Sequence, residues 1–254
     1  MPGTTHFWHH FKPAHLLHRL AHRVLPSHCA LCMAACEEQL CTPCRHAYFS
    51  CHTARCLQCG LPSQAPHCAQ CLQQLPAFDA TIVAADYVPP ADQLVLALKF
   101  GHRLALAPMF AHLLRDALLQ QQATRPGYAP LPLPDLLLPV PLGPQRLRER
   151  GFNQALQIAR PLARALGIAL HARWLLRARD TGAQSLLHPA QRNKNVQHAF
   201  ALTPEAHAGI AGHHVGLVDD VMTTGATLNE VAATLKRHGA TRVTNLVFAR
   251  TPPS

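Results

Sequence analysis

The 254-residue chain is 48% hydrophobic and 14% charged, and it carries a formal net charge of +10 at pH 7. This composition is too apolar for a disordered chain and predicts a folded protein with more than one unit. No run of about 18 consecutive apolar residues occurs, which excludes a helical membrane span. The first residues contain His, Lys and Arg throughout instead of the apolar stretch of a secretory signal, so we expect a soluble, cytoplasmic protein.

The positive charge comes mostly from arginine, whose planar guanidinium suits contacts with phosphate. It favours a polyanionic partner, either a nucleic acid or a phosphorylated small molecule. Many proteins are basic for solubility alone, so net charge does not by itself identify a partner.

The cysteines divide the chain into regions of different chemistry. All ten lie between Cys29 and Cys71, and so sharp a change in composition predicts a domain boundary soon after the last of them. We therefore expect a His-rich arm over residues 1–26, a Cys-rich domain over 27–76 and a second domain over 77–254. For the histidines of the arm, a solvated segment is favoured over a metal site.

Eight of the cysteines form four Cys-x-x-Cys pairs in succession, which are Cys29/Cys32, Cys41/Cys44, Cys56/Cys59 and Cys68/Cys71. Two residues between thiolates allow a tight turn to aim both sulfurs at one tetrahedral ion, and two such turns close a four-sulfur zinc site with no open position. We therefore expect structural zinc, as one ion or two. The first and second pairs are separated by as many residues as the third and fourth, which indicates two tandem zinc ribbons. A cross-braced arrangement, in which the first pair joins the third and the second joins the fourth, would use the same ligands.

The alternative for these cysteines is a disulfide framework, which needs an export route that the first residues do not provide. Cys36 and Cys51 have no Cys-x-x-Cys partner and are interpreted as buried or spare thiols without a role. A unit this small cannot fold on apolar burial alone, so zinc would supply much of its folding energy. Zinc ribbons bind nucleic acid or protein, and the ligands do not show which.

After residue 77, short β-branched runs alternate with longer helical ones, which predicts an α/β domain with a mainly parallel sheet and flanking helices. In chain order the pattern predicts a strand over 80–87, helices over 92–100 and 104–122, a proline-rich loop over 124–134, a strand over 135–142, a helix over 153–166, short strands over 174–177 and 199–202, a strand over 213–221, a helix over 224–238 and a strand over 242–250. Asn153 is a candidate N-cap, Pro161 is expected to kink its helix, and Gly239 is expected to end the last one.

The most informative segment is 216–227, which reads Gly-Leu-Val-Asp-Asp-Val-Met-Thr-Thr-Gly-Ala-Thr. Asp219 and Asp220 end a buried strand, where unpaired carboxylates are costly, so they indicate hydroxyls, a metal or a cation as partner. The small residues behind them form a turn into a helix, where free N–H groups bind anions; these residues are Thr223, Thr224, Gly225, Ala226 and Thr227. The alternative for the acids is a charge at the helix N-terminus or a structural Mg²⁺ site. Acids for a ribose diol beside a phosphate cradle predict a 5-phosphoribosyl ligand.

This segment resembles the signature of type I phosphoribosyltransferases, and it is not a Walker P-loop because no Gly-Lys-Ser/Thr follows. A second segment narrows the resemblance and consists of Pro139-Val140-Pro141-Leu142, then Arg146, Arg148 and Arg150-Gly151-Phe152-Asn153-Gln154. With the Cys pairs, these motifs are similar to the ComF family, in which a double zinc ribbon precedes a phosphoribosyltransferase domain like that of amidophosphoribosyltransferases. The resemblance extends from about Cys29 to Arg250.

The resemblance implies a role for each part of the site. The two acids would hold the ribose hydroxyls of phosphoribosyl pyrophosphate, and the turn after them would enclose its 5-phosphate. Lys99, Arg148 and Arg150 are assigned to the pyrophosphate, with Mg²⁺ bridging pyrophosphate and ribose oxygens. The alternatives are a solvated basic loop for the arginines and a lysine that extends from an apolar helix to solvent.

A third part of the resemblance is a polar stretch where such enzymes carry a mobile, substrate-covering segment, and its residues are Gln184, Leu187, Arg192, Asn195, Ala199 and Phe200. Gln191 is neutral where the family pattern has a charged residue, which leaves the contacts of this segment with substrate open.

The resemblance thus implies a protein that binds phosphoribosyl pyrophosphate, expected to be a phosphoribosyltransferase linked to DNA uptake, competence or the use of DNA as a nutrient. Breaking the bond from ribose C1 to pyrophosphate has oxocarbenium character, so catalysis needs positioning and charge stabilisation, not a nucleophile. The rival interpretation is a non-catalytic adaptor that binds single-stranded DNA and keeps the fold. Competence or DNA-processing proteins are the further partners considered, and the acceptor base is left open.

Overall fold

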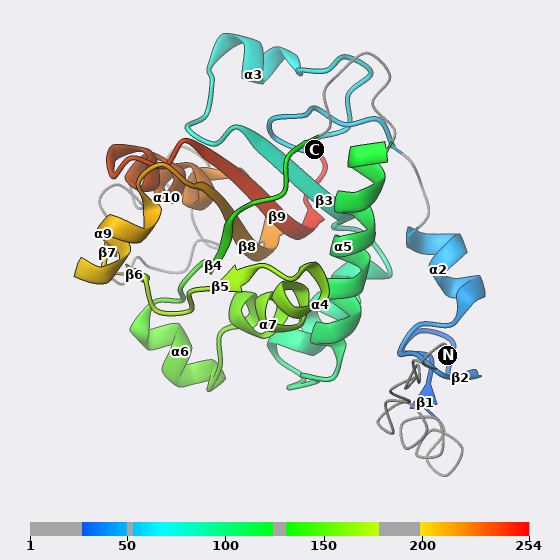
Figure 1. Cartoon of the computed structure of the whole chain (residues 1–254). Coiled ribbons are helices and arrows are strands. Elements are labelled where there is room, and N and C mark those ends of the chain that lie inside the picture. The colour runs from blue at the N-terminus through cyan, green and yellow to red at the C-terminus, as the bar shows by residue number, and fades with distance from the viewer. Residues whose placement is uncertain (1–26, 50–52, 124–130, 178–198, 254) are drawn as a thin grey trace, which may run out of the picture.

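The computed structural model describes residues 27–49, 53–123, 131–177 and 199–253 (Figure 1). Its centre is a five-stranded sheet in which all neighbouring strands are parallel. In spatial order the strands are β3 (Ala80–Asp86), β9 (Arg242–Arg250), β8 (His214–Met222), β4 (Leu136–Pro139) and β5 (Ala169–Leu170). The predicted α/β class with a mainly parallel sheet is confirmed.

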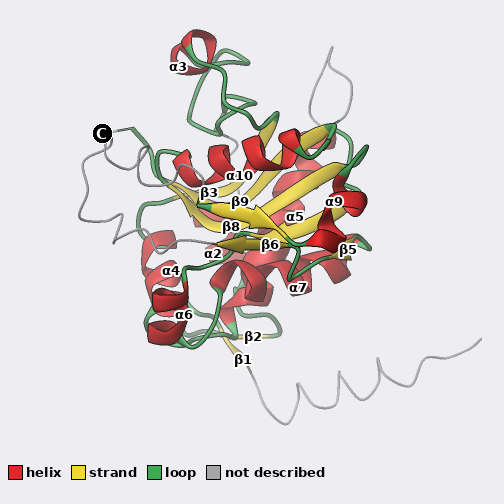
Figure 2. Cartoon of the chain, turned by 90° about the vertical axis from the view of Figure 1, so that its left-hand side faces the viewer, coloured by secondary structure: helices red, strands yellow, loops and turns green. Residues whose placement is uncertain are grey.

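Helices cover both faces of this sheet (Figure 2). One face packs against α4 (Ala91–Lys99), α5 (Leu106–Ala123) and α7 (Gln154–Leu166), and the other against α10 (Ala226–Arg237), α9 (Pro204–Ile210) and a separate antiparallel pair of β6 (Leu175–Arg177) and β7 (Phe200–Leu202). A short helix, α6 (Pro144–Arg150), follows β4. The core therefore consists of two apolar layers with the sheet between them.

Strand β9 shows why this sequence folds as the interior of a parallel sheet. Val243 and Val247 pack toward α10, while Leu246 and Phe248 pack toward α5. The ring of Phe248 stacks on that of Phe110 with 3.7 Å between their centroids. A strand that is apolar on both faces is what helices on both sides require.

Most of the predicted elements are present, and the prediction over 242–250 matches β9 at both ends. Asn153 is the N-cap of α7, where its Oδ1 accepts from the Leu156 N–H at 3.4 Å. No element was predicted between residues 142 and 153, where the structure has α6. Pro144 supplies the fixed φ of a first helical turn, and Gly151, with a φ of +73°, ends the helix.

Several sequence predictions lie outside the described residues. They are the arm over 1–26, Cys51, most of the loop over 124–134, and Gln184, Leu187, Gln191, Arg192 and Asn195 of the polar stretch. Ala199 and Phe200 are described, and Phe200 begins β7. Pro161 lies inside α7.

The Cys-rich region consists of two units with the same backbone pattern. The first contains β1 (Ser27–His28), β2 (Ala35–Cys36) and α2 (Thr42–Phe49), and the second contains α3 (Ala69–Gln73). The N–H of Cys29 donates to the carbonyl of Ala34 and, at the equivalent place, that of Cys56 donates to Leu61, both at 2.8 Å. Met33 and Gly60 also occupy equivalent positions with positive φ. The units are therefore structural repeats.

The two Cys-rich units pack on different parts of the sheet domain. Leu40 and Cys41 of the first unit belong to the apolar layer that contains α5, whereas Cys56 and Cys71 of the second belong to the layer that contains α10. Figure 1 shows α2 beside α5, and α3 at a separate end of the molecule. The division at residues 76 and 77 stays a prediction, since each unit shares a core with the sheet.

The second Cys-rich unit also lies along the outer edge of β3. The Thr81 N–H donates to the Leu57 carbonyl at 3.1 Å, and its hydroxyl donates to the Gln58 carbonyl at 2.5 Å. Arg55 donates to Asp86 at 2.8 Å near the end of the strand. The second unit therefore contacts β3 near both of its ends.

Among the helices in the described part of the chain, none is long and apolar enough to cross a membrane.

Candidate functional site

Two adjacent acids lie near the carboxyl end of β8, and each makes a different contact. The Asp220 carboxylate is buried and pairs with the ammonium of Lys99, with 2.9 Å between Oδ2 and Nζ. The Asp220 N–H donates to Asp219 Oδ1 at 2.9 Å, and the Val221 N–H donates to Asp220 Oδ1 at 2.8 Å. Lys99 lies in the last turn of α4 and extends to the acids of β8, not to solvent.

The surroundings of Asp219 favour its protonated form. Burial, together with the neighbouring charge of Asp220, raises the pKa of Asp219 to about 8, against a weaker opposing effect of Lys99. A protonated carboxyl donates a hydrogen bond, whereas the carboxylate of Asp220 accepts one. The pair can therefore offer both a donor and an acceptor to a diol.

The predicted anion-binding turn connects β8 to α10. Gly225 is the N-cap of α10 and has a φ of +84°, a conformation that favours glycine. A Cβ at this position would lie 2.5 Å from Met222 Cε. The Ala226 N–H donates to Thr224 Oγ1 at 3.3 Å. The turn thus places backbone N–H groups and hydroxyls at the N-terminus of a twelve-residue helix, where the helix dipole favours an anion.

The acids and the turn line one open cavity of about 430 Å³. Its basic residues come from three further elements and are Lys99 of α4, Arg146 and Arg150 of α6, and Arg177 of β6. Four cationic side chains and two acids therefore face the same space, which leaves the lining with excess positive charge. Such a lining favours a ligand with several negative charges.

Most of the residues predicted for this site lie together. Asp219, Asp220, Lys99 and Arg150 line the cavity, as does every residue of the turn from Thr223 to Thr227. Arg148 is exposed on α6 and is absent from the cavity lining, where Arg146 of the same helix is present. Residues two apart on a helix point in different directions, which explains why these two arginines separate.

Sequence reasoning assigned no site role to several lining residues, among them Tyr87, Arg146 and Arg177. Tyr87 directly follows β3, and Arg177 is the last residue of β6. In a parallel sheet the residues after the carboxyl ends of the strands converge on one side. Applied to the predicted strand over 80–87, that rule would have found Tyr87. It would not have found Arg177, because β6 belongs to the separate antiparallel pair and not to the parallel sheet.

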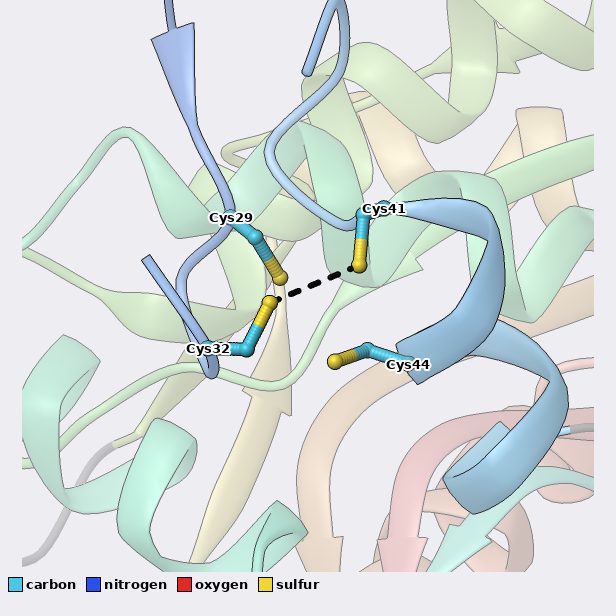
Figure 3. Close-up of side chains that lie close together, drawn as sticks. All are labelled: Cys29, Cys32, Cys41 and Cys44. Carbon is cyan, nitrogen blue, oxygen red and sulfur yellow. Dashed lines mark hydrogen bonds between the residues drawn. The ribbon is translucent and has the colours of Figure 1, made fainter. Parts of the chain in front are cut away.

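The eight paired cysteines form two separate groups of four, each composed of consecutive pairs. Figure 3 shows the first group, in which all four sulfurs point toward a common centre. Within each group the sulfur atoms all lie within 4.8 Å of one another. The Cys32 and Cys41 sulfurs are 3.6 Å apart, as are those of Cys59 and Cys68. A Zn–S bond of about 2.3 Å in a tetrahedron places sulfurs roughly 3.8 Å apart. The arrangement is therefore tandem, and both groups could bind zinc.

At two positions of the repeat, the pKa values of equivalent thiols in the two groups are shifted in the same direction. Burial opposes ionisation of Cys29 and Cys56, but backbone N–H groups of the adjoining turns outweigh it and lower the pKa of both to about 6. Burial and nearby thiols raise the pKa of Cys44 to about 12, and they raise that of Cys71 as well. A bound divalent cation would release the remaining protons. Cys36, outside both groups, donates to the Glu38 carbonyl at 2.7 Å.

Comparison with solved structures finds low similarity to phosphoribosyl-transferring enzymes. The glutamine phosphoribosylpyrophosphate amidotransferase of B. subtilis matches with a TM-score of 0.34 and 22% identity over 56% of this chain and 26% of that one. A purine phosphoribosyltransferase from Pyrococcus horikoshii matches with a TM-score of 0.28 and 17% identity over 68% of this chain and 92% of that one. Likeness at this level does not identify a family.

Sequence comparison finds much closer relatives. The DNA utilization protein YhgH of Salmonella typhi is 36% identical over 233 residues, which are 89% of this chain and 98% of that protein. Competence protein F of Haemophilus influenzae is 32% identical over 218 residues, 85% of this chain and 92% of that protein. Residues 153–253 match the phosphoribosyl transferase domain family. The chain therefore belongs to the family of DNA utilization protein YhgH and competence protein F, the ComF family, with a phosphoribosyl transferase domain after two groups of four cysteines.

Proposed function

We propose that the cavity at the end of β8 binds phosphoribosyl pyrophosphate. The observation that carries this proposal is the shared lining, in which two acids, an anion-binding turn and four basic side chains face one space of about 430 Å³. Asp219 and Asp220 would bind the two ribose hydroxyls. The N–H groups and hydroxyls of the turn over 223–227 would bind the 5-phosphate at the N-terminus of α10.

The pyrophosphate is assigned to the basic side of the cavity. Lys99 and Arg150 line it, as predicted, and Arg146 takes the place expected of Arg148. Burial lowers the pKa of Arg150, but a guanidinium remains charged far above neutral pH. Its side chain also lies over the Phe100 ring, 5.0 Å from the centroid, which limits its rotation. A planar guanidinium fixed in this way suits bidentate contact with phosphate.

Carboxylate oxygens near the pyrophosphate position are donors of the kind that Mg²⁺ prefers. When bound, Mg²⁺ would neutralise charge on the pyrophosphate leaving group. The residues of the chain supply the rest. Lys99 and the arginines stabilise the negative charge that develops as the bond from C1 to pyrophosphate breaks, and the turn holds the 5-phosphate so that C1 stays in place. We propose transfer of the phosphoribosyl group to an acceptor that enters the open side of the cavity.

The relatives named for DNA utilization and competence suggest the setting of this reaction. We propose that the chain acts in the uptake or use of DNA, in the cytoplasm, and that single-stranded DNA is a partner. The net charge of +10 supports contact with a polyanion. A role in binding competence or DNA-processing proteins stays a prediction.

Calorimetric titration with phosphoribosyl pyrophosphate, with and without Mg²⁺, tests the proposal. We expect Mg²⁺-dependent binding that is lost in the double variant Asp219→Asn/Asp220→Asn and kept in Glu149→Gln, which changes an exposed acid of α6 outside the cavity lining. Equal affinity in the double variant would refute the site assignment.

The transferase and adaptor interpretations need a second measurement. Pyrophosphate release with candidate free bases would support transfer. Salt-dependent binding of single-stranded DNA without any pyrophosphate release would instead favour the non-catalytic adaptor.

A further inference from the structure

Arg250, the last residue of β9, joins the second Cys-rich unit to the phosphate-binding turn. It is only 4% exposed. Its guanidinium donates to the carbonyl oxygens of Cys59, Met222 and Thr251, each at 3.0 Å, and also contacts the carbonyl of Thr223. One buried side chain thus holds a metal-ligand residue on one side and the start of the turn on the other.

The turn has open space on both sides of its backbone. Thr224, Gly225 and Ala226 line the first cavity and also a second one, of about 370 Å³, whose lining includes Cys59 and Arg250. Thr223 and Thr224 are exposed, so packing does not fix this part of the turn, and hydrogen bonds to its carbonyls take on much of that role. Arg250 supplies bonds to two consecutive carbonyls where the turn begins.

We infer that Arg250 is a positioning residue that orients the phosphate-binding turn against the second Cys-rich unit, so that metal bound at this unit sets the affinity of the turn for phosphate. This rests on the proposed function and adds that a metal site outside the cavity controls the affinity for phosphate. The four residues Cys56, Cys59, Cys68 and Cys71 would hold the ion. The bound ion would fix the position of the Cys59 carbonyl. Because Arg250 donates to this carbonyl and also to those of residues 222 and 223, it would hold the start of the turn in a fixed position relative to the metal site.

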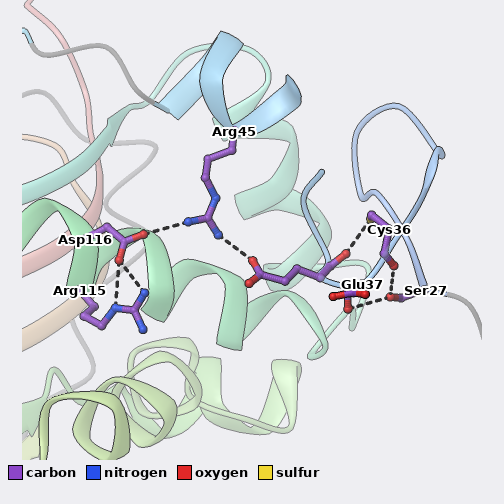
Figure 4. Close-up of polar contacts among 7 residues, drawn as sticks. Ser27, Cys36, Glu37, Arg45, Arg115 and Asp116 are labelled. Carbon is purple, nitrogen blue, oxygen red and sulfur yellow. Dashed lines mark hydrogen bonds and ion pairs between the residues drawn. The ribbon is translucent and has the colours of Figure 1, made fainter. Parts of the chain in front are cut away.

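The first Cys-rich unit offers a matched control, because it is also joined to the sheet domain by an arginine (Figure 4). Arg45 of α2 pairs with Glu38 at 2.7 Å and with Asp116 of α5 at 2.9 Å. Neither acid lines the first cavity. Arg45 and Arg250 thus anchor equivalent repeats, but only Arg250 contacts the turn.

The first test compares Arg250→Lys and Arg250→Met with Arg45→Met by calorimetric titration with phosphoribosyl pyrophosphate and Mg²⁺. Lysine keeps the charge but lacks the planar fork that reaches several carbonyls at once. We expect both Arg250 variants to raise the dissociation constant by about tenfold or more, and Arg45→Met to leave it within about twofold. Wild-type affinity in Arg250→Lys, with Arg250→Met folded by circular dichroism, would overturn the role of the guanidinium fork.

The second test concerns the metal link and does not depend on the ligand. Cys68→Ser and Cys41→Ser change equivalent ligands of the second and first groups, and each should lose one zinc ion per chain. We expect faster amide hydrogen exchange over residues 222–228 in Cys68→Ser than in Cys41→Ser. Equal exchange in the two would overturn the link. If the wild type fails to bind phosphoribosyl pyrophosphate but this difference appears, the proposed function fails while the coupling stands.

Discussion

At the level of single residues, the acids of β8 combine a buried ion pair with a carboxyl that favours its proton. For Asp219 the folded-state pKa is about 8, well above the value near 3.9 expected in an unfolded chain. Its negative charge therefore costs folding free energy. That cost is absent below the unfolded value and grows as pH rises toward the folded one.

The pH dependence of the variant Asp219→Asn follows from this sign. Replacing the carboxyl by a neutral amide removes the cost of ionisation, so the variant should gain stability relative to wild type between about pH 4 and pH 8 as pH rises. Urea unfolding midpoints measured across this range would show it. A difference that does not change with pH would contradict the raised pKa.

Lys99 and Asp220 lead to a prediction about their pairing. In Lys99→Met the buried Asp220 carboxylate loses its cation, which should lower the free energy of unfolding by roughly 1.5–3 kcal/mol. Adding Asp220→Asn removes the unpaired charge, so the double variant should recover much of the loss. Chemical denaturation of the four members of this cycle measures the coupling. Simple additivity of the two single effects would show that the pair contributes nothing.

At the level of elements, the turns of the two Cys-rich repeats show how one backbone shape accepts different residues. Met33 and Gly60 share a positive φ, but Met33 is exposed, whereas a Cβ on Gly60 would lie 2.5 Å from Val83 Cγ2. The second turn lies so close to β3 that glycine is needed for space as well as for φ.

Gly60→Ala should therefore destabilise the protein by more than the roughly 1 kcal/mol that a left-handed conformation costs an alanine. Gly167→Ala is the control, because Gly167 has a φ of +69° and no heavy atom within 4 Å of an added Cβ. The difference in unfolding free energy between the two variants isolates the contact with Val83. Equal losses would mean that β3 moves aside without cost.

The elements that could be predicted from the sequence are those whose signals lie in neighbouring residues of the chain. The apolar run over 242–250 and the Asn153 cap are visible from neighbouring residues alone. Pro144 and Gly151 give α6 equally local start and end signals. The partner of Lys99 and the four carbonyls held by Arg250 were not predictable, because they depend on how α4, β8, β9 and the second Cys-rich unit pack together.

At the level of the whole molecule, the Cys-rich region is integrated with the sheet domain and not simply attached before it. The composition break after Cys71 predicted a separate domain, and the Cys-x-x-Cys spacing predicted the ligands. The spacing left the pairing open, and the three-dimensional grouping shows that it is tandem. Sequence could not show that the repeats pack into opposite apolar layers, because that depends on long-range contacts.

Tandem grouping predicts the metal content. Two zinc ions per chain should be found by elemental analysis of the purified protein, and either Cys29→Ser or Cys56→Ser should reduce the content to one. The double variant Cys29→Ser/Cys56→Ser should retain no zinc, because the two residues belong to different groups. In a cross-braced arrangement both would be ligands of the same ion, and one zinc would remain. One zinc ion retained in the double variant would therefore contradict the tandem groups.

The contacts of the second Cys-rich unit with Thr81 and Asp86 have one more consequence, which concerns self-association. β3 is the outermost strand on its side of the sheet, and an uncovered outer strand offers unpaired N–H and C=O groups to another chain. The second unit occupies these groups at Thr81. Zinc bound to this unit would therefore help to prevent strand pairing between molecules. When a chelator removes the zinc, the protein should form oligomers before its sheet unfolds.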